Sequence, residues 1–172
     1  MPTFDDQRPT QEHFVTRVPQ KSVGFTLSQI GLENARQFAL VAGQFGLEPR
    51  HFAVLHALAD RDGLSQQSVG DNLSIPASTM VSIVDHLESA GLVERHLEPH
   101  DRRTRVLHLT GAGRARLTDA LRGAHEHEAR ICFNFTAIER AELLSLLERV
   151  ATNLGIAPNS LPDHGSGTHP EH

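Results

Sequence analysis

The sequence predicts a mainly α-helical protein with one small β-hairpin. In most of the stretch from residue 24 to residue 154, apolar side chains recur every three or four positions, which is typical of helices that bury one face. Residues 92–97 and 105–110 instead alternate partly between apolar and polar residues around a polar turn, as the strands of a hairpin do. The length of 172 residues suits one core, because two ordinary domains would need a longer chain.

Composition points to a soluble cytoplasmic protein. Apolar residues make up 38% of the chain and charged residues 22%, which is a globular balance, and no apolar run is long enough to span a bilayer. The first residues include acidic residues and prolines, where a signal peptide needs a basic start and an apolar core. The single cysteine, Cys132, suits a reducing compartment. We therefore expect no membrane partner.

Four helices are expected before the hairpin. Residues 24–45 have helical apolar spacing and end at Gly46, a common stop residue. Pro49 opens the second helix, because proline is tolerated in a first turn. Ser65 can cap a short third helix, and Pro76 starts the fourth. Helices joined by such short turns indicate a helix-turn-helix core.

Two long helices are expected after the hairpin. Thr110 can cap the fifth helix, and Thr136 with Glu139 forms a T-x-x-E capping box ahead of the sixth. The first, fifth and sixth helices carry more apolar surface than a small core needs. They could simply pack on that core, but we favour a dimer interface that includes Leu147 and Val150, because long apolar stripes on soluble helices usually find a partner.

This order of elements predicts a winged helix-turn-helix fold flanked by long dimerisation helices. The expected parts are an N-terminal arm (1–22), a dimerisation helix (23–46), the winged helix-turn-helix region (47–110), the C-terminal dimerisation helices (111–155) and a tail (156–172). The tail is rich in Pro, Gly, Ser and His, so we expect it to be disordered.

Three segments of the chain resemble the MarR (multiple antibiotic resistance regulator) family. They are LEPRHFAVLHALAD, STMVSIVDHLESAGLVERHLEPHDRRTRVLHLTGAGRARL and TAIERAELLSLLERV. The most specific pattern is D-R-R followed after a few residues by L-x-L-T-x-x-G. The resemblance covers about residues 25–154 and implies a homodimeric transcriptional regulator, a repressor, that binds a pseudo-palindromic DNA operator and is released by small molecules or oxidation. No phosphate loop, nucleophile elbow or H-E-x-x-H pattern is present, so we expect no enzyme and no cofactor.

The fourth helix is the expected recognition helix. Small hydroxyl residues let its backbone approach phosphates and can donate to base edges. Its exposed positions are Ala77, Ser78, Thr79, Ser82 and His86. Members of the family often have arginine where this chain has Ser82 and His86. A second set at the start of the third helix could hold a phosphate: Ser65, Gln66 and Gln67. For the hydroxyl residues of both sets, simple helix capping is the alternative.

The hairpin loop is the expected basic element. It concentrates Arg102, Arg103 and Arg105 within four residues, a cluster suited to the minor groove, although a solvated turn is the alternative. Such a local cluster is needed because residues 47–115 hold 7 Arg against 9 Asp and Glu, a balance of −2. By resemblance, Asp101 pairs with Arg103 and supports the wing.

The resemblance also places an effector crevice between the DNA-binding region and the dimer helices. A small aromatic acid would need apolar walls and a cation or an imidazole there. The candidate residues are Phe25, Gln29, Arg50, His51 and Leu55. A surface position is the alternative for His51.

Metal-sensing, redox-sensing and protein-docking functions are the alternatives. His125 and His127 are two residues apart on a helix and so face different directions, which disfavours a metal site. Cys132 lies in an apolar stretch, which predicts a buried, inert thiol, although Arg130 nearby keeps a redox sensor open. A winged helix used only for protein docking would bind no duplex, and its interactions would depend weakly on salt.

Overall fold

A computed structural model describes residues 22–98 and 101–156. The chain divides into two compact units, Met1–Ala35 and Arg36–His172. The described part of the first unit, residues 22–35, contains the first half of helix α1 (Val23–Gly43). The second unit contains the rest of α1 and all of the other helices and strands.

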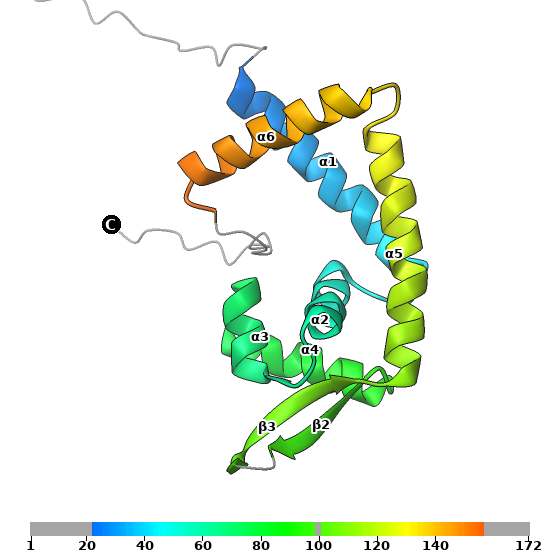
Figure 1. The fold of residues 1–172 in the computed structure, drawn as a ribbon, viewed down its shortest axis with the longest axis vertical. Helices are drawn as coiled ribbons and strands as arrows, with labels where there is room; N and C mark the ends of the chain where they lie inside the picture. Colours follow the sequence, from blue (N-terminus) through cyan, green and yellow to red (C-terminus); the bar gives the residue numbers. More distant parts are fainter. Residues whose placement is uncertain (1–21, 99–100, 157–172) are drawn as a thin grey trace, which may run out of the picture. The chain divides into compact units, whose positions relative to one another are not determined.

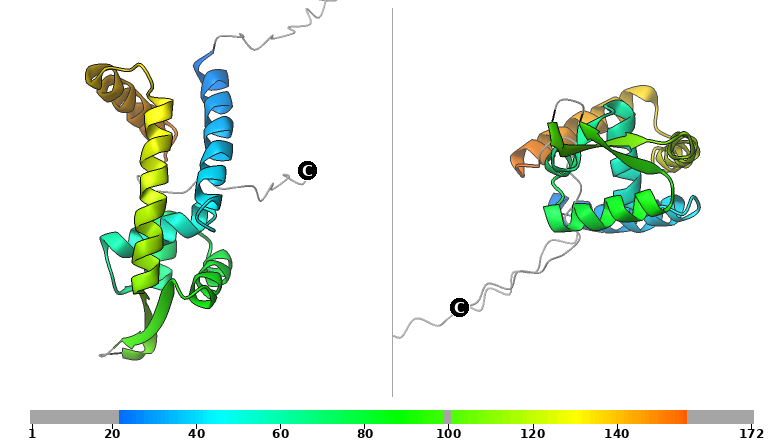
Figure 2. Two further views of the ribbon diagram at one scale, coloured as in Figure 1. Left: turned by 90° about the vertical axis from the view of Figure 1, so that its right-hand side faces the viewer. Right: turned by 90° about the horizontal axis from the view of Figure 1, so that it is seen from below.

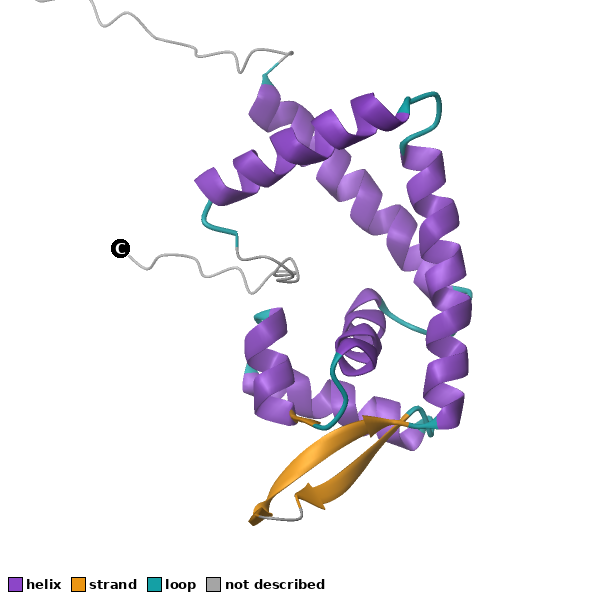
Figure 3. Ribbon diagram, viewed as in Figure 1, coloured by secondary structure: helices purple, strands orange, loops and turns teal. Residues whose placement is uncertain are grey.

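The second unit has the predicted order of helices around a hairpin (Figures 1 and 3). After α1 its elements are α2 (Pro49–Asp60), β1 (Leu64–Ser65), α3 (Gln66–Leu73), α4 (Ala77–Ser89), β2 (Val93–Glu98), β3 (Asp101–Leu109), α5 (Gly111–Ile131) and α6 (Ala137–Asn153). Helices α2, α3 and α4 and the hairpin gather where α5 begins, and α6 follows the other end of α5 (Figure 1). The predicted fold class is confirmed.

The sheet has one strand more than the sequence predicted. It is antiparallel, with the strand order β1-β3-β2, and β1 pairs through Leu64 opposite Leu107 and Ser65 opposite Val106. A strand of two residues is too short to show alternation, so no sequence pattern marks it. It ties the start of α3 to the hairpin.

The core lies where α2, α3, α4, the hairpin and the first half of α5 meet. Helix α4 contributes one apolar face, and all four of its side chains are buried: Met80, Ile83, Val84 and Leu87. On α5, Leu117 is buried but Ile131 is exposed, so the apolar stripe of this helix runs beyond the core. Within the described residues, α6 has no buried residue.

The L-x-L-T-x-x-G pattern joins the hairpin to α5. The hydroxyl of Thr110 accepts from the amide of Gly113 at 2.9 Å and donates to the carbonyl of Gly91 at 2.7 Å. A Cβ atom at Gly113 would lie only 2.0 Å from the carbonyl oxygen of Leu92. The glycine of the pattern therefore lets the first turn of α5 approach the backbone at the start of β2.

Replacing Gly113 by alanine should lower the free energy of unfolding by about 1–3 kcal/mol or prevent folding, because α5 and the backbone of Leu92 must separate. Gly111→Ala is the matched control, since no described atom lies within 4 Å of a Cβ built there. The control should be neutral or slightly more stable, because alanine favours helices. Urea unfolding followed by circular dichroism measures both variants, and equal midpoints would contradict this packing.

Candidate nucleic-acid interface

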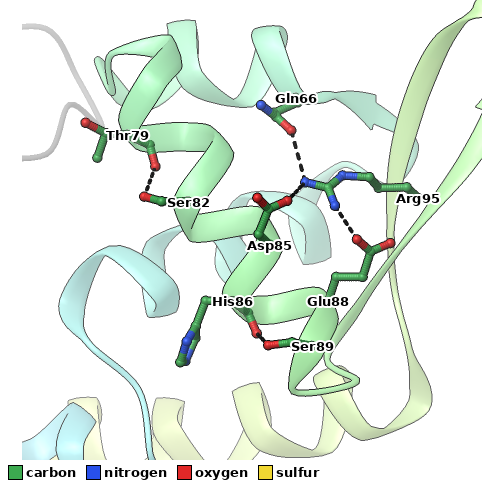
Figure 4. Close-up of polar contacts among 8 residues, drawn as sticks. All are labelled: Gln66, Thr79, Ser82, Asp85, His86, Glu88, Ser89 and Arg95. Carbon is green, nitrogen blue, oxygen red and sulfur yellow. Dashed lines mark hydrogen bonds and ion pairs between the residues drawn. The ribbon is translucent and has the colours of Figure 1, made fainter.

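Helix α4 and the hairpin lie at the same end of the second unit (Figure 2), and α4 exposes one face to solvent. Ala77, Ser78 and Ser82 are exposed on this helix, and Thr79 is half-buried. The hydroxyl of Ser82 donates to the carbonyl of Thr79 at 2.8 Å (Figure 4), which leaves its oxygen able to accept. The predicted recognition surface is therefore available on the first half of α4.

Val81 was missed as a surface residue of this helix. It is 45% exposed, although its apolar side chain would favour the core. The signal was its position, since residue 81 lies outside the buried stripe that runs along the helix from Met80 to Leu87 at spacings of three and four residues. An exposed branched side chain on a recognition helix suits contact with a thymine methyl group.

His86 and His51 lie against each other, a contact that the sequence did not predict. Their rings are parallel, with centroids 4.5 Å apart and an interplanar angle of 7°. His51 is buried, so the alternative of a surface position is wrong. Its Nδ1 accepts from the amide of Glu48 at 3.2 Å, which caps the start of α2.

The environment of His51 favours its neutral form. Burial lowers the pKa of His51 below its usual 6.5; the charge of Glu48 opposes this shift, and His86 and Arg50 reinforce it. A neutral ring with Nδ1 as acceptor carries its proton on Nε2. His86, on the recognition helix, is therefore packed against an uncharged residue of α2.

The start of α3 is built mainly as a helix cap. Ser65 accepts from the amide of Ser68 at 3.1 Å, and the two hydroxyls are 2.8 Å apart. Gln66 accepts from Arg95, while Gln67 is exposed. The capping alternative for Ser65 is therefore observed, and Gln67 is the member of this set with the most exposed side chain.

Arg95 of β2 is the centre of an ion-pair network on the flank of α4 (Figure 4). Its guanidinium donates to Asp85 Oδ1 at 2.5 Å and also contacts Glu88 Oε2. Both carboxylates belong to α4, three residues apart. From the sequence, Arg95 was noted only as an arginine on the strand opposite the basic loop, and its pairing with α4 was missed, although acidic residues at this spacing share a helix face and can meet one cation.

The tip of the hairpin is described only in part. Arg105 on β3 is exposed. The side chains of residues 101–104, which include Asp101, Arg102 and Arg103, lie outside the described residues. Their roles remain sequence predictions.

The effector candidates differ in their surroundings. Leu55 is fully buried in the core, so a ligand could reach it only if the core opened. Arg50 is exposed and pairs with Glu48 at 2.6 Å. Phe25 and Gln29 belong to the unit that ends at Ala35, where both are exposed.

One described pocket, of about 540 Å³, lies at the junction of α5 and α6 instead. Its described lining residues are Ala129, Cys132, Phe135, Thr136, Ala137, Arg140, Ala141 and Leu144. Arg140 is already paired with Glu128 at 2.9 Å. The effector candidates are not among these residues.

Cys132 is not the fully buried thiol that the sequence predicted. It is half-buried at the end of α5, and its Sγ lies 3.7 Å from a carboxylate oxygen of Glu128. The expectation failed because the apolar residues around it, such as Phe133 and Ile131, are exposed. Within residues 22–98 and 101–156, no group of three or more His, Cys, Asp or Glu residues could hold a metal ion.

A helix with an exposed hydroxyl face beside a two-stranded hairpin, both on one core, defines a winged helix-turn-helix DNA-binding protein. The family model described as the MarR family matches residues 45–104. The transcriptional regulator PecS of Dickeya dadantii is 32% identical over 132 residues, which are 75% of this chain and 80% of PecS. The chain belongs to the MarR family of transcriptional regulators.

Solved structures of similar chains share the fold. The transcriptional repressor CouR, in a structure with a 23-mer DNA duplex, is 33% identical with a TM-score of 0.69, and the match covers 76% of this chain and 92% of CouR. A MarR-family regulator from Rhodococcus sp. RHA1 is 26% identical with a TM-score of 0.66, covering 76% of this chain and 93% of that one. The predicted family and the DNA-binding regulatory function are confirmed.

In the part of the chain that the structure describes, no helix is both apolar and long enough to cross a bilayer.

Proposed function

We propose that this chain acts as a homodimer that binds a pseudo-palindromic operator and represses transcription until a small aromatic acid releases it. The observation that carries the proposal is the pairing of an exposed, hydroxyl-rich α4 with an arginine-bearing hairpin. In this mode α4 enters the major groove and the hairpin arginines reach the adjacent minor groove.

The similarity to CouR supports binding to duplex DNA. CouR was solved with a 23-mer duplex, which is long enough for two half-sites about one helical turn apart. On this chain, the base-contacting set is Ala77, Ser78, Val81 and Ser82 on α4. Arg102, Arg103 and Arg105 supply the positive charge that the acidic chain needs.

The apolar surface of α5 and α6 supports a dimer. Large apolar residues along this region are exposed in the single chain: Ile131, Phe133, Phe135, Ile138, Leu144, Leu146, Leu147 and Leu154. A patch of this kind would be costly to leave in water. A second copy offers the same apolar surface, so a two-fold interface can cover both at once.

Replacing Arg102 and Arg103 by alanine should weaken operator binding about tenfold or more at fixed salt and lower the slope of log K against log salt by about 1 per lost contact. Arg122→Ala is the control, because Arg122 is exposed on α5 and pairs with Asp119. Fluorescence anisotropy with a duplex selected from a random pool measures both. Unchanged binding by the double variant would contradict the role of the hairpin.

Changing Leu147 and Val150 to lysine should convert the dimer into monomers that bind the operator poorly. Two positive charges without partners are costly to bury in an apolar interface. Glu142→Lys adds a cation at an exposed position of the same helix and should leave a dimer. Analytical ultracentrifugation gives the oligomeric state, and circular dichroism confirms that helices persist. A double variant that sediments as the wild type does would disprove this interface.

A small aromatic carboxylate should release the operator duplex, because the exposed guanidinium of Arg50 at the start of α2 can receive an anion. His51 is buried against His86, so it would take part only if this stacking opened. Arg50→Gln should reduce the response to the ligand, whereas Arg61→Gln, an exposed arginine just after α2, should not. The measurement is displacement of the bound duplex by salicylate and related acids, and a series without any displacement would remove the aromatic-acid proposal.

A further inference from the structure

Arg95 joins three elements of the DNA-binding region. It lies on β2 opposite Leu107 of β3. One guanidinium nitrogen lies 2.5 Å from Asp85 Oδ1 and 3.5 Å from the side-chain oxygen of Gln66 at the start of α3, and the other contacts Glu88 (Figure 4). A planar fork of this kind holds its partners in a fixed geometry.

Arg95 is badly placed to contact DNA itself. Its side chain is only 15% exposed, compared with 59% for Asp85 and 42% for Glu88. Its donors already serve two carboxylates and an amide oxygen. The guanidinium group of Arg95 is therefore already paired within the protein and is not available to a phosphate.

The two carboxylates would otherwise oppose DNA binding. Asp85 and Glu88 lie on α4 just beyond the exposed residue Ser82, and both are partly open to solvent. Two unpaired negative charges on a recognition helix would repel the phosphates. With Arg95 in place, the group carries a net charge of −1 and α4 is attached to β2.

We infer that Arg95 is a positioning residue, which fixes the recognition helix against the hairpin so that both reach DNA together. This inference rests on the proposed DNA-binding mode. It goes further by assigning part of the affinity to a residue that does not touch DNA. Arg95 therefore raises the affinity for DNA mainly by holding α4 in position, and not only by neutralising the two carboxylates.

The full-length double variant Asp85→Asn with Glu88→Gln separates geometry from charge. It makes α4 more positive by two charges, so an electrostatic effect alone would strengthen DNA binding. Positioning by Arg95 predicts the opposite: affinity for the selected duplex falls at least threefold, because the guanidinium has lost its charged anchors. Tighter binding by this variant would overturn the inference.

Arg95→Gln gives a second, independent readout. It should lower affinity at least tenfold while leaving the slope of log K against log salt unchanged, whereas Arg105→Ala should lower that slope by about 1. Arg95→Lys should restore affinity only in part, because an ammonium lacks the planar fork. Melting curves confirm that each variant is folded. If Arg95→Gln does not fold, the double carboxylate variant decides alone.

The outcomes also distinguish this inference from the proposed function. A wild-type chain that binds no selected duplex would overturn both. If Arg95→Gln binds the duplex as tightly as the wild type does, the inferred role of Arg95 is overturned, but the proposed function is not. The same holds if the salt slope of Arg95→Gln falls as much as that of Arg105→Ala.

Discussion

The second unit depends on one close approach, between the first turn of α5 and the carbonyl group of Leu92. Gly113 permits it, and Thr110 fixes it with one hydrogen bond on each side of the junction. The same junction ends β3 and starts α5, so the direction of α5 follows from the position of the hairpin. Helix α6 continues from α5. This contact thus links the hairpin to α5 and, through α5, to α6.

Local signals predicted most of this fold, whereas contacts between distant residues escaped prediction. The capping box of Thr136 and Glu139 and the cap at Thr110 were both readable, because their partners lie within three residues. The network of Arg95 joins β2, α3 and α4, and the contact of His51 with His86 joins α2 and α4. The spacing of apolar residues along the sequence gives no information on such contacts between elements. The prediction that Cys132 is fully buried was wrong. An apolar stretch of sequence does not reveal whether the residues that cover it belong to this chain or to another copy.

Local ion pairs reduce the repulsion that single carboxylates of this acidic chain would exert on DNA, although they leave its net charge unchanged. The chain has a formal net charge of −5, but several carboxylates near the core are occupied within it. Asp62 accepts from the amide of Leu109 and pairs with His108 at 3.1 Å and Arg114 at 3.4 Å. Although burial opposes it, hydrogen bonding by His108 and Leu109 holds the pKa of Asp62 below its usual value. The exposed arginine of the hairpin, Arg105, can then act at short range, where bulk charge matters less.

Two contacts hold the second half of α4, one on each flank. His86 stacks on His51 of α2, and Asp85 and Glu88 pair with Arg95 of the hairpin. The first half of the helix carries small side chains that leave its backbone accessible. These contacts couple the orientation of α4 to α2 and to the hairpin. Because α2 also carries Arg50, the anion that we propose for this site would act on the same helix that supports the ring of His86. Displacement of α2 would therefore shift the recognition surface without any ligand contact to α4.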